Sequence, residues 1–435
     1  MNREYSDRRQ KLMHKIGKGT AIFRSAPTAV MHNDVEYNFR QDSSFFYLTG
    51  FNEPNAVVVL APHHEKHQYI LFVRPKDQEK ETWSGLRTGV ELAKEKYGAD
   101  ITYSIEDLDK ELPQYLEKCD KIYYHFGRDE AFNNRIIKHW RNLVKTYSKR
   151  GTGPKSIEDA KFILNSLRVI KSDSELALMR RAIDISCAAH NYAFNMTKPG
   201  LYEYQIQAEM EYIFAKNGGS SAYPSIVASG ENSCILHYVE NNRMMQENDL
   251  LLIDAGCSYQ YYNGDITRTF PVNGKFTRPQ KIIYELVLKA QIEAIAQIKP
   301  GNSWNLVHDK AVRILTEGFM ELGFLQGDIE EIIKEEKYKA FYMHKTSHWL
   351  GLDVHDAGDY QIGENIWQEL QTGQILTIEP GIYIAPNYKP AEGQPEINDE
   401  WKGIGIRIED DVLVTEKGYE ILTESVPKSI SSMEK

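Results

Sequence analysis

The amino-terminal part of the chain alternates short apolar runs with longer polar stretches. Apolar residues follow one another in AVVVLAP (56–62) and YILFV (69–73), which is typical of buried strands, whereas IEDLDKELPQYLEKC (105–119) has helical spacing. The stretch KRGTGPKSIEDA (149–160) then interrupts the apolar pattern with glycine, proline and charged residues. We therefore predict an α/β domain over residues 1–157.

Residues 158–435 form the predicted second domain, which begins with a helical pattern from Glu158 to about Phe194. A weak internal repeat follows. The segment MTKPGLYEYQIQAEMEYIFAKNG (196–218) is echoed by QIKPGNSWNLVHDKAVRILTEGFMELG (297–323), and both place Lys-Pro-Gly before a helical pattern. The Pro-Gly pair is expected to form a turn before each helix.

The echo continues in two apolar segments, LLLIDAGCSYQYY (250–262) and QILTIEPGIYIAP (374–386). Each has a buried-strand pattern that ends in an acid, one further residue and a glycine. Two similar halves of helix and antiparallel strand, each delivering acids at matched places, predict a pseudo-symmetric α+β domain with a shared central site.

Composition narrows the class of protein. The chain has 435 residues, 41% of them hydrophobic, and a formal net charge of −10 without a basic stripe, so nucleic acid is not an expected partner. The charged amino terminus lacks the apolar segment of a secretory signal, and no apolar run is long enough to cross a bilayer. Four widely spaced cysteines form no C-x-x-C pair, which fits a reducing cytoplasm.

Four acids stand where apolar strands end. Asp254 closes one such strand, Asp265 follows after an aromatic turn, and Glu379 and Glu409 repeat the arrangement in ILTIEPG and GIGIRIEDDVLVT. A carboxylate at such a place costs desolvation free energy unless a cation or hydrogen bonds offset it. For one acid alone, a turn or capping role is the better explanation, but four acids in one domain favour a metal site.

Histidines could add a nitrogen ligand. His344 and His348 are four residues apart and His355 follows the glycine turn, but Lys345 stands where the zinc-protease motif needs glutamate. One histidine with four carboxylates makes a hard, oxygen-rich donor set that suits Mn²⁺ and similar ions. Four acids also supply enough negative charge for two divalent ions.

Several long motifs in this order resemble one family, aminopeptidase P, the Xaa-Pro aminopeptidase of the pita-bread metallopeptidases. The resemblance spans nearly the whole chain. The motifs that carry it are FRQDSSFFYLTGFNEPNAVVVL, ETWSGLRTG, SGENSCILHY, LLIDAGCSYQYYNGDITRTFPV, SHWLGLDVHDAG, TIEPGIYIAP and GIGIRIEDDVLVT.

The resemblance implies two divalent metal ions, with Mn²⁺ expected first and Co²⁺ or Zn²⁺ as alternatives. It implies that Asp254 chelates one ion, that Asp265 and Glu409 bridge, and that His348 and Glu379 complete the shell of the second ion. In such enzymes a metal-bridging water or hydroxide attacks the scissile carbonyl. The remaining roles are carried over as catalytic for Glu379 (proton shuttle), His237 and His355, and as substrate-binding for His344, Tyr383 and Arg407.

The implied reaction is removal of the N-terminal residue from peptides whose second residue is proline. An X-Pro bond is a tertiary amide without an N–H, so a dedicated pocket is needed. Prolidase, which prefers X-Pro dipeptides, has the same fold and ligands and is the nearest alternative. Creatinase alters the ligand positions and non-enzymatic pita-bread binding modules lose ligands, whereas all five ligand positions are intact here.

Other positions receive simpler expectations. Asp353, Asp356, Asp410 and Asp411 adjoin the site motifs and are assigned capping or solvated roles. Trp83, in ETWSGLRTG, is interpreted as a buried core residue, with reach into a neighbouring active site as the alternative. Members of the family assemble through the amino-terminal domain, so a homodimer or homotetramer is expected.

Overall fold

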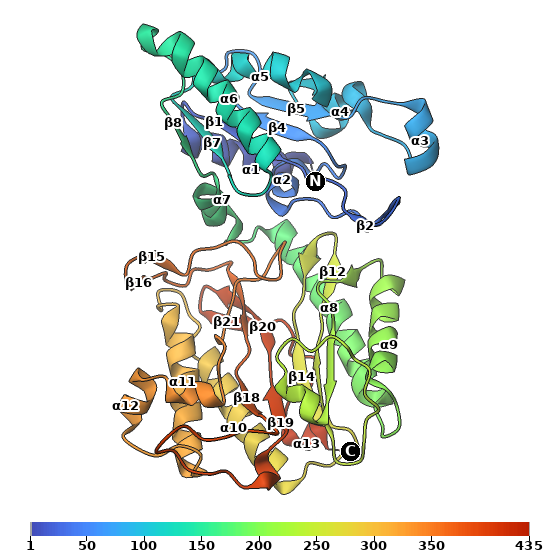
Figure 1. Cartoon of the computed structure of the whole chain (residues 1–435), viewed down its shortest axis with the longest axis vertical. Coiled ribbons are helices and arrows are strands. Elements are labelled where there is room, and N and C mark those ends of the chain that lie inside the picture. The colour runs from blue at the N-terminus through green and yellow to red at the C-terminus, as the bar shows by residue number, and fades with distance from the viewer. Residues whose placement is uncertain (1, 435) are drawn as a thin grey trace. The chain divides into compact units, whose positions relative to one another are not determined.

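The computed structural model describes residues 2–434 and divides into two compact units, Met1–Leu167 and Arg168–Lys435. Figure 1 shows both units. The predicted boundary at residue 157 would cut strand β8 (Ser156–Glu158), which pairs in parallel with β7 (Lys121–Tyr124). Hydrogen bonding within this sheet therefore keeps β8 in the amino-terminal unit.

The first unit is built on a six-stranded mixed sheet in the order β6-β5-β4-β1-β7-β8. The two predicted strands are confirmed as β4 and β5, which lie side by side and antiparallel. The predicted helix over 105–119 is a 3₁₀ turn followed by α5, so the expected α/β domain is confirmed. Strand β4 spans Val57–Leu60 and β5 spans Tyr69–Val73. The other strands are β1 (Thr20–Arg24), β6 (Ile101–Ser104) and the hairpin of β2 (Val30–His32) and β3 (Val35–Glu36).

Helices surround this sheet, and aliphatic and aromatic side chains of α5 and α6 pack with it in one core cluster. The cluster includes Ile22, Val59, Phe72, Leu112 and Ile136. The helices of the unit are α1 (Asn2–Ile16), α2 (Ser43–Thr49), α3 (Gln78–Ser84), α4 (Gly89–Tyr97), α5 (Leu108–Leu116), α6 (Glu130–Tyr147) and α7 (Lys161–Arg168).

The expected helix from 158 to 194 is wrong in one respect, because it is two helices. Helix α7 ends at Arg168, and a separate helix, α8, spans Asp173–Met196. The cause is a capping box: Glu175 N–H donates to Ser172 Oγ at 3.3 Å, and Ser172 N–H donates to Glu175 Oε2 at 3.0 Å. This reciprocal cap satisfies the free N–H groups of a new helix and fixes its start.

The second unit has the predicted two halves, each opening with a pair of helices. The pairs are α8 with α9 (Glu203–Lys216) and α10 (Arg278–Ile295) with α11 (Asn305–Glu321). The Lys-Pro-Gly turns stand between the two helices of each pair. Gly200 and Gly301 adopt φ angles of 87° and 84°, a left-handed region that favours glycine. The two Lys-Pro-Gly segments therefore form the same kind of glycine turn in both halves.

Each half also contributes an antiparallel strand pair that ends in acids. In the first, β11 (Leu250–Asp254) pairs with β14 (Thr267–Pro271), and in the second β17 (Ile375–Ile378) pairs with β20 (Asp410–Thr415). Asp254 stands opposite Thr267, and Ile378 opposite Asp410. The four acids predicted at strand ends therefore flank equivalent ends of the two pairs, which confirms the pseudo-symmetric α+β fold.

Shorter elements complete the second unit, whose core joins α8 to α11 with the strands. They are β9 (Ser220–Ser221), β10 (Ile226–Ser229), η3 (Gly230–Cys234), β12 (Cys257–Tyr259), β13 (Tyr262–Asn263), α12 (Ile329–Lys334), η4 (Lys337–Ala340), β15 (Gln361–Gly363), β16 (Ile366–Trp367), β18 (Gly381–Ile384), η5 (Asp399–Trp401), β19 (Ile404–Arg407), β21 (Gly418–Ile421) and α13 (Ile430–Met433).

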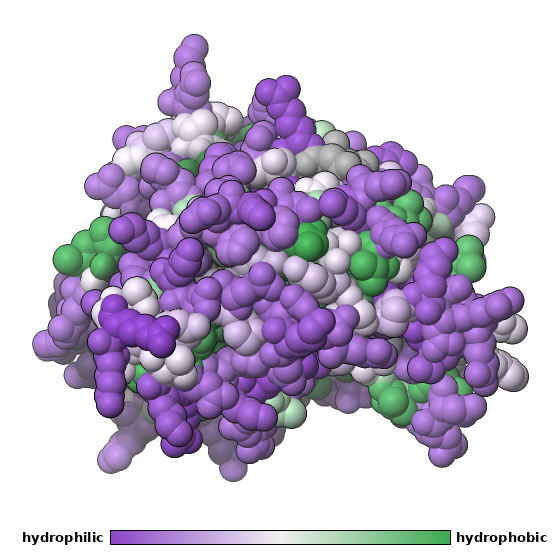
Figure 2. All heavy atoms as spheres, turned by 90° about the horizontal axis from the view of Figure 1, so that it is seen from above, coloured by the Kyte–Doolittle hydropathy of each residue, from purple (hydrophilic) through white to green (hydrophobic). Residues whose placement is uncertain are grey.

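The surface is predominantly polar. Figure 2 shows one face on which hydrophilic side chains predominate and apolar ones form small separate patches. Trp83 is 87% exposed, so its interpretation as a core residue is wrong. It lies on the short helix α3, none of whose residues is buried. Among residues 2–434, no helix is both long and apolar enough to cross a membrane.

A buried ion cluster stabilises the start of the second unit. Asp356 accepts from Arg168 Nη2 at 2.5 Å and from Lys171 Nζ at 3.0 Å, and all three side chains are at most 5% exposed. Burial alone would raise the pKa of Asp356, but the two cations outweigh it and hold that pKa below its ordinary value. The expectation of a capping or solvated role for Asp356 is therefore wrong.

Asp356→Asn should destabilise the second unit by about 3–5 kcal/mol, because it leaves two buried cations without their shared carboxylate. Denaturant unfolding at neutral pH would measure the loss. Since the folded pKa is depressed, the carboxylate's contribution is present above the unfolded pKa and is lost as pH falls through the folded one. The stability difference between Asp356→Asn and the unaltered protein should therefore shrink in acid.

The matched control is Asp353→Asn. Asp353 also pairs with Arg168, at 2.9 Å, but its side chain is 42% exposed. Its replacement should cost less than about 1 kcal/mol. Equal losses for the two variants would contradict the importance of burial at Asp356.

Candidate metal centre and active site

Three of the five predicted ligands come within reach of a single ion. One ligand atom each of Asp265, His348 and Glu409 lies within 4.8 Å of the others, and all three residues are buried. Glu379 Oε1 is 3.6 Å from His348 Nε2. Asp254 and Asp265 are joined through the hydroxyl of Tyr223, which contacts a carboxylate oxygen of each. The structure thus brings the five together, and their role as ligands stays a prediction.

His348 is oriented by its backbone surroundings. Its segment runs beside β17, where Thr377 N–H donates to the carbonyl of His348 at 3.0 Å. The ring Nδ1 lies 3.1 Å from the carbonyl oxygen of Trp349, which can only accept, so Nδ1 carries a proton. Nε2 is therefore directed at Asp265, 3.4 Å away. A histidine whose other nitrogen is bonded in this way is the usual form of a metal ligand.

The electrostatics of the cluster favour added positive charge. Burial together with the charges of Asp265 and Asp254 raises the pKa of Glu379 to about 7, although His348 and Arg407 oppose this. Burial and the neighbouring acids also raise the pKa of Glu409 well above its ordinary value. Such crowding of carboxylates is unfavourable unless cations compensate it, and oxygen donors of this kind suit hard divalent ions. The residues present therefore fit a divalent metal centre.

The charge of the acids also acts on His348. Burial alone would lower the pKa of its imidazole, but the hydrogen bond to Asp265 and the charge of Glu379 outweigh burial and raise that pKa to about 9. The imidazole of His348 thus offsets part of the negative charge of the neighbouring acids.

Two ligand neighbours were missed from the sequence. Tyr223 Oη lies 2.7 Å from Asp254 Oδ1 and also contacts Asp265, while Thr267 Oγ1 donates to Glu409 Oε2 at 2.6 Å. Both hydroxyls orient carboxylates. Thr267 begins β14, two residues after Asp265 in the motif DITRTF, so its closeness in the sequence to a predicted ligand could have indicated it. Tyr223 precedes β10 and no spacing in the sequence distinguishes it.

The predicted substrate-side residues form one chain of hydrogen bonds. Arg407 Nη2 donates to Asp254 Oδ2 at 2.5 Å, and its Nη1 donates to Tyr383 Oη at 2.8 Å. Tyr383 Oη also lies 2.9 Å from His344 Nε2. Because His344 Nδ1 faces the carbonyl oxygen of Lys345 at 2.8 Å, Nδ1 is the donor and Nε2 accepts from Tyr383.

His344 is neutral in this chain, since burial and the nearby Arg407 lower its pKa to about 3. Tyr383 and Arg407 come from the paired strands β18 and β19, where Gly381 stands opposite Arg407. The paired strands therefore hold the hydrogen-bonded chain against Asp254.

The two predicted catalytic histidines are placed differently. The ring of His355 packs edge-on against that of His348, with centroids 4.4 Å apart. Burial and the charge of His348 lower the pKa of His355, and His237 contributes in the same direction. His237 is exposed on the loop after β10. The structure thus brings His355 into contact with a predicted ligand and leaves His237 on an open segment.

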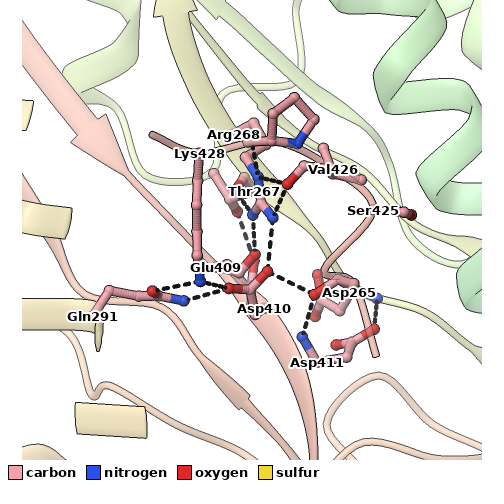
Figure 3. A network of polar contacts seen from close by, with 12 residues as sticks. Asp265, Thr267, Arg268, Gln291, Glu409, Asp410, Asp411, Ser425, Val426 and Lys428 are labelled. Atoms are coloured by element: carbon pink, nitrogen blue, oxygen red, sulfur yellow. Dashed lines mark hydrogen bonds and ion pairs between the residues drawn. The ribbon is translucent and has the colours of Figure 1, made fainter. Parts of the chain in front are cut away.

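A second buried network lies behind Glu409 (Figure 3). Arg268 Nη1 donates to the carbonyl oxygen of Glu409 at 2.5 Å, and its Nη2 donates to Asp410 Oδ1 at 2.7 Å. Gln291 Nε2 donates to Asp410 Oδ2 at 2.7 Å, and Lys428 contacts the same oxygen. Burial would raise the pKa of Asp410, but Arg268 and Lys428 outweigh it and depress that pKa strongly.

Asp411 is equally buried, and its Oδ2 accepts from the backbone N–H of Asp265 at 3.0 Å. Burial and the charge of Asp265 raise the pKa of Asp411 well above its ordinary value. The expectation of capping or solvated roles for Asp410 and Asp411 is therefore wrong. Both support the backbone that carries predicted ligands.

Comparison with known proteins agrees with this geometry. The family described as metallopeptidase family M24 matches residues 177–416, and the family described as aminopeptidase P, N-terminal domain, matches residues 5–123. The Xaa-Pro aminopeptidase of Haemophilus influenzae is 42% identical over 433 residues, covering 99% of this chain and 96% of its own. That of Escherichia coli is 41% identical over 435 residues, with the same coverage.

Solved structures give the same result for the fold. Aminopeptidase PepP of Pseudomonas aeruginosa superposes with a TM-score of 0.93 at 45% identity, covering 100% of this chain and 97% of that one. Zinc-substituted aminopeptidase P of Escherichia coli, in complex with product, has a TM-score of 0.92 at 40% identity, with coverages of 100% and 97%. The chain belongs to metallopeptidase family M24 and, within it, to the aminopeptidase P family.

Proposed function

We propose that this protein is a two-metal Xaa-Pro aminopeptidase, which hydrolyses the first peptide bond of peptides with proline in second place. The observation that carries the proposal is the meeting of Asp265, His348 and Glu409 within 4.8 Å in a chain whose full-length relatives are named Xaa-Pro aminopeptidases. The relatives' names also favour this activity over prolidase.

In this proposal Asp254 holds one ion, Asp265 and Glu409 bridge the pair, and His348 and Glu379 hold the second. When bound, two divalent ions polarise the scissile carbonyl and lower the pKa of attacking water. We propose Mn²⁺ as the physiological metal, with Co²⁺ and Zn²⁺ as alternatives. The oxygen-rich donor set supports the first choice. Reloading the metal-free protein with each ion and comparing turnover would test it.

The other side chains serve the substrate. Glu379 is proposed to move a proton to the leaving nitrogen, since its side chain is 18% exposed and thus open to a bound peptide. His237 and His355 are proposed to hold the substrate carbonyl. The chain of His344, Tyr383 and Arg407 borders Asp254 and could orient the amino end of the peptide.

We also propose that the protein acts in the cytoplasm as a homodimer or homotetramer. All four cysteines are free, which supports a reducing compartment. Trp83 and Leu86 are 87% and 88% exposed on the amino-terminal unit, which supports a contact between copies. Sedimentation analysis would test the assembly, and a monomer at micromolar concentration would contradict it.

The proposed specificity predicts a substrate profile. An X-Pro-X tripeptide should be turned over faster than the matching X-Pro dipeptide, because the proposed aminopeptidase acts on bonds followed by a longer chain. N-acetylation of the tripeptide should remove most activity, since a free amine is proposed to lie near Asp254. Steady-state kinetics on the three peptides provide the measurement. Preference for the dipeptide would indicate a prolidase, and equal rates for acetylated and free peptides would contradict N-terminal specificity.

Asp265→Ala should abolish activity, because it removes a proposed bridging ligand from both ions. Bound metal, measured by elemental analysis, should fall below that of the unaltered protein. The amino-terminal unit should stay folded, since Asp265 lies outside it. Asp309→Ala is a suitable control, because Asp309 is an exposed aspartate in the same unit on α11. Near-normal turnover in Asp265→Ala would contradict the two-metal proposal.

A further inference from the structure

The segment that carries His237 leaves β10 at Ser229 and continues through η3 to Arg243. We call residues 229–243 the His237 loop. Exposed apolar side chains stand on either side of the histidine, with Ile235 53% and Val239 50% exposed. Beside the histidine, Leu236 and Tyr238 pack into a small apolar cluster, and a polar contact from outside the loop adds to this packing in fixing its course.

Glu203 makes that contact, and it is fully buried at the start of α9. Its Oε1 accepts from Ser229 N–H at 2.6 Å, from Ser229 Oγ at 2.7 Å and from Asn232 Nδ2 at 3.2 Å. Its Oε2 accepts from Tyr238 Oη at 2.8 Å and from Arg243 N–H at 2.9 Å. All five hydrogen bonds come from the His237 loop, so one carboxylate gathers its beginning, its middle and its end.

Further contacts close the loop around this carboxylate. Arg243 Nη1 donates to Ser229 Oγ at 2.8 Å, which links the two ends, and Glu203 N–H donates to the carbonyl oxygen of Arg243 at 3.1 Å. Burial and the bond to Glu203 raise the pKa of Tyr238 to about 12, so its hydroxyl stays a donor at neutral pH. Tyr238 directly follows His237, and its bond therefore fixes the backbone next to the histidine.

We propose that Glu203 is a positioning residue that holds the His237 loop so that His237 faces the substrate. The inference rests on the proposed peptidase function. Its physical basis is the donor set, since both oxygens of a carboxylate accept hydrogen bonds, whereas an amide of the same shape replaces one acceptor by a donor. A purely local role as a helix cap would use N–H groups in the first turn of α9, and none of the five donors lies in that helix.

A double-mutant cycle tests the proposal with Glu203→Gln and His237→Ala, singly and together, in the metal-loaded full-length protein. Glu203→Gln should lower kcat/KM for an X-Pro-X tripeptide by about tenfold when His237 is present, and by less than about twofold in the His237→Ala background. Bound metal should be unchanged in all variants. General loss of structure would lower activity equally in both backgrounds. Glu209→Gln, the same substitution at a partly buried position on α9, is the matched control and should retain normal kinetics.

Tyr238→Phe is the second variant, because it removes one donor beside His237 and keeps the buried ring. It should lower kcat/KM several-fold, again only when His237 is present, and it decides the question alone if Glu203→Gln does not fold. Equal effects in both backgrounds, or normal kinetics in Glu203→Gln and Tyr238→Phe, would overturn the inference. Failure of the unaltered protein to cleave any X-Pro peptide would instead overturn the proposed function, and normal activity of His237→Ala would overturn the role of His237.

Discussion

Like-charged carboxylates buried close together are the constraint on which the second unit depends. Asp265, Glu409 and Glu379 surround one histidine, and the charge of Asp265 disfavours ionisation of both glutamates. His348 and Arg407 offset part of this charge. A fold can hold such a group only if the backbone fixes each acid firmly and further positive charge is available, and divalent cations supply that charge in a form that oxygen ligands accept.

The pseudo-symmetric strand pairs provide the fixed backbone. Asp254 and Asp265 flank the end of β11 and β14, while Glu379 and Glu409 flank the end of β17 and β20. The halves are also joined to each other, since Glu409 N–H donates to the carbonyl oxygen of Thr267 at 3.0 Å. Acids contributed by two separate strand pairs therefore meet at ends that backbone hydrogen bonds fix, which keeps the side chains preorganised.

The strand-end acids, the repeat and the classes of the two domains could be predicted from the sequence. Each of them depends on a local pattern or on a motif whose residues are close together in the chain. The roles of Asp410 and Asp356 could not be predicted from the sequence. Their partners are remote, with Arg268 separated from Asp410 by 142 positions and Arg168 from Asp356 by 188. Short acidic motifs look solvated until such cations are brought to them. The contacts of Glu203 could not be predicted for the same reason, since its position at the start of a helix does not indicate that a loop folds over it.

The charge partners also separate the buried acids into two classes. Asp356 and Asp410 each have two cationic side chains of the chain itself, and their pKa values are depressed. Glu379 and Glu409 lack comparable compensation, and their pKa values are raised. Acids of the first class are already neutralised and hold structure. The charged forms of Glu379 and Glu409 are unfavourable until a cation is added, which is the behaviour expected of ligands in a cation-binding site. Two adjacent residues, Glu409 and Asp410, fall on opposite sides of this division, because Glu409 precedes β20 and faces the other predicted ligands, whereas Asp410 begins β20 and pairs with Arg268 and Lys428. The start of β20 thereby joins the proposed metal centre to its ion-paired support.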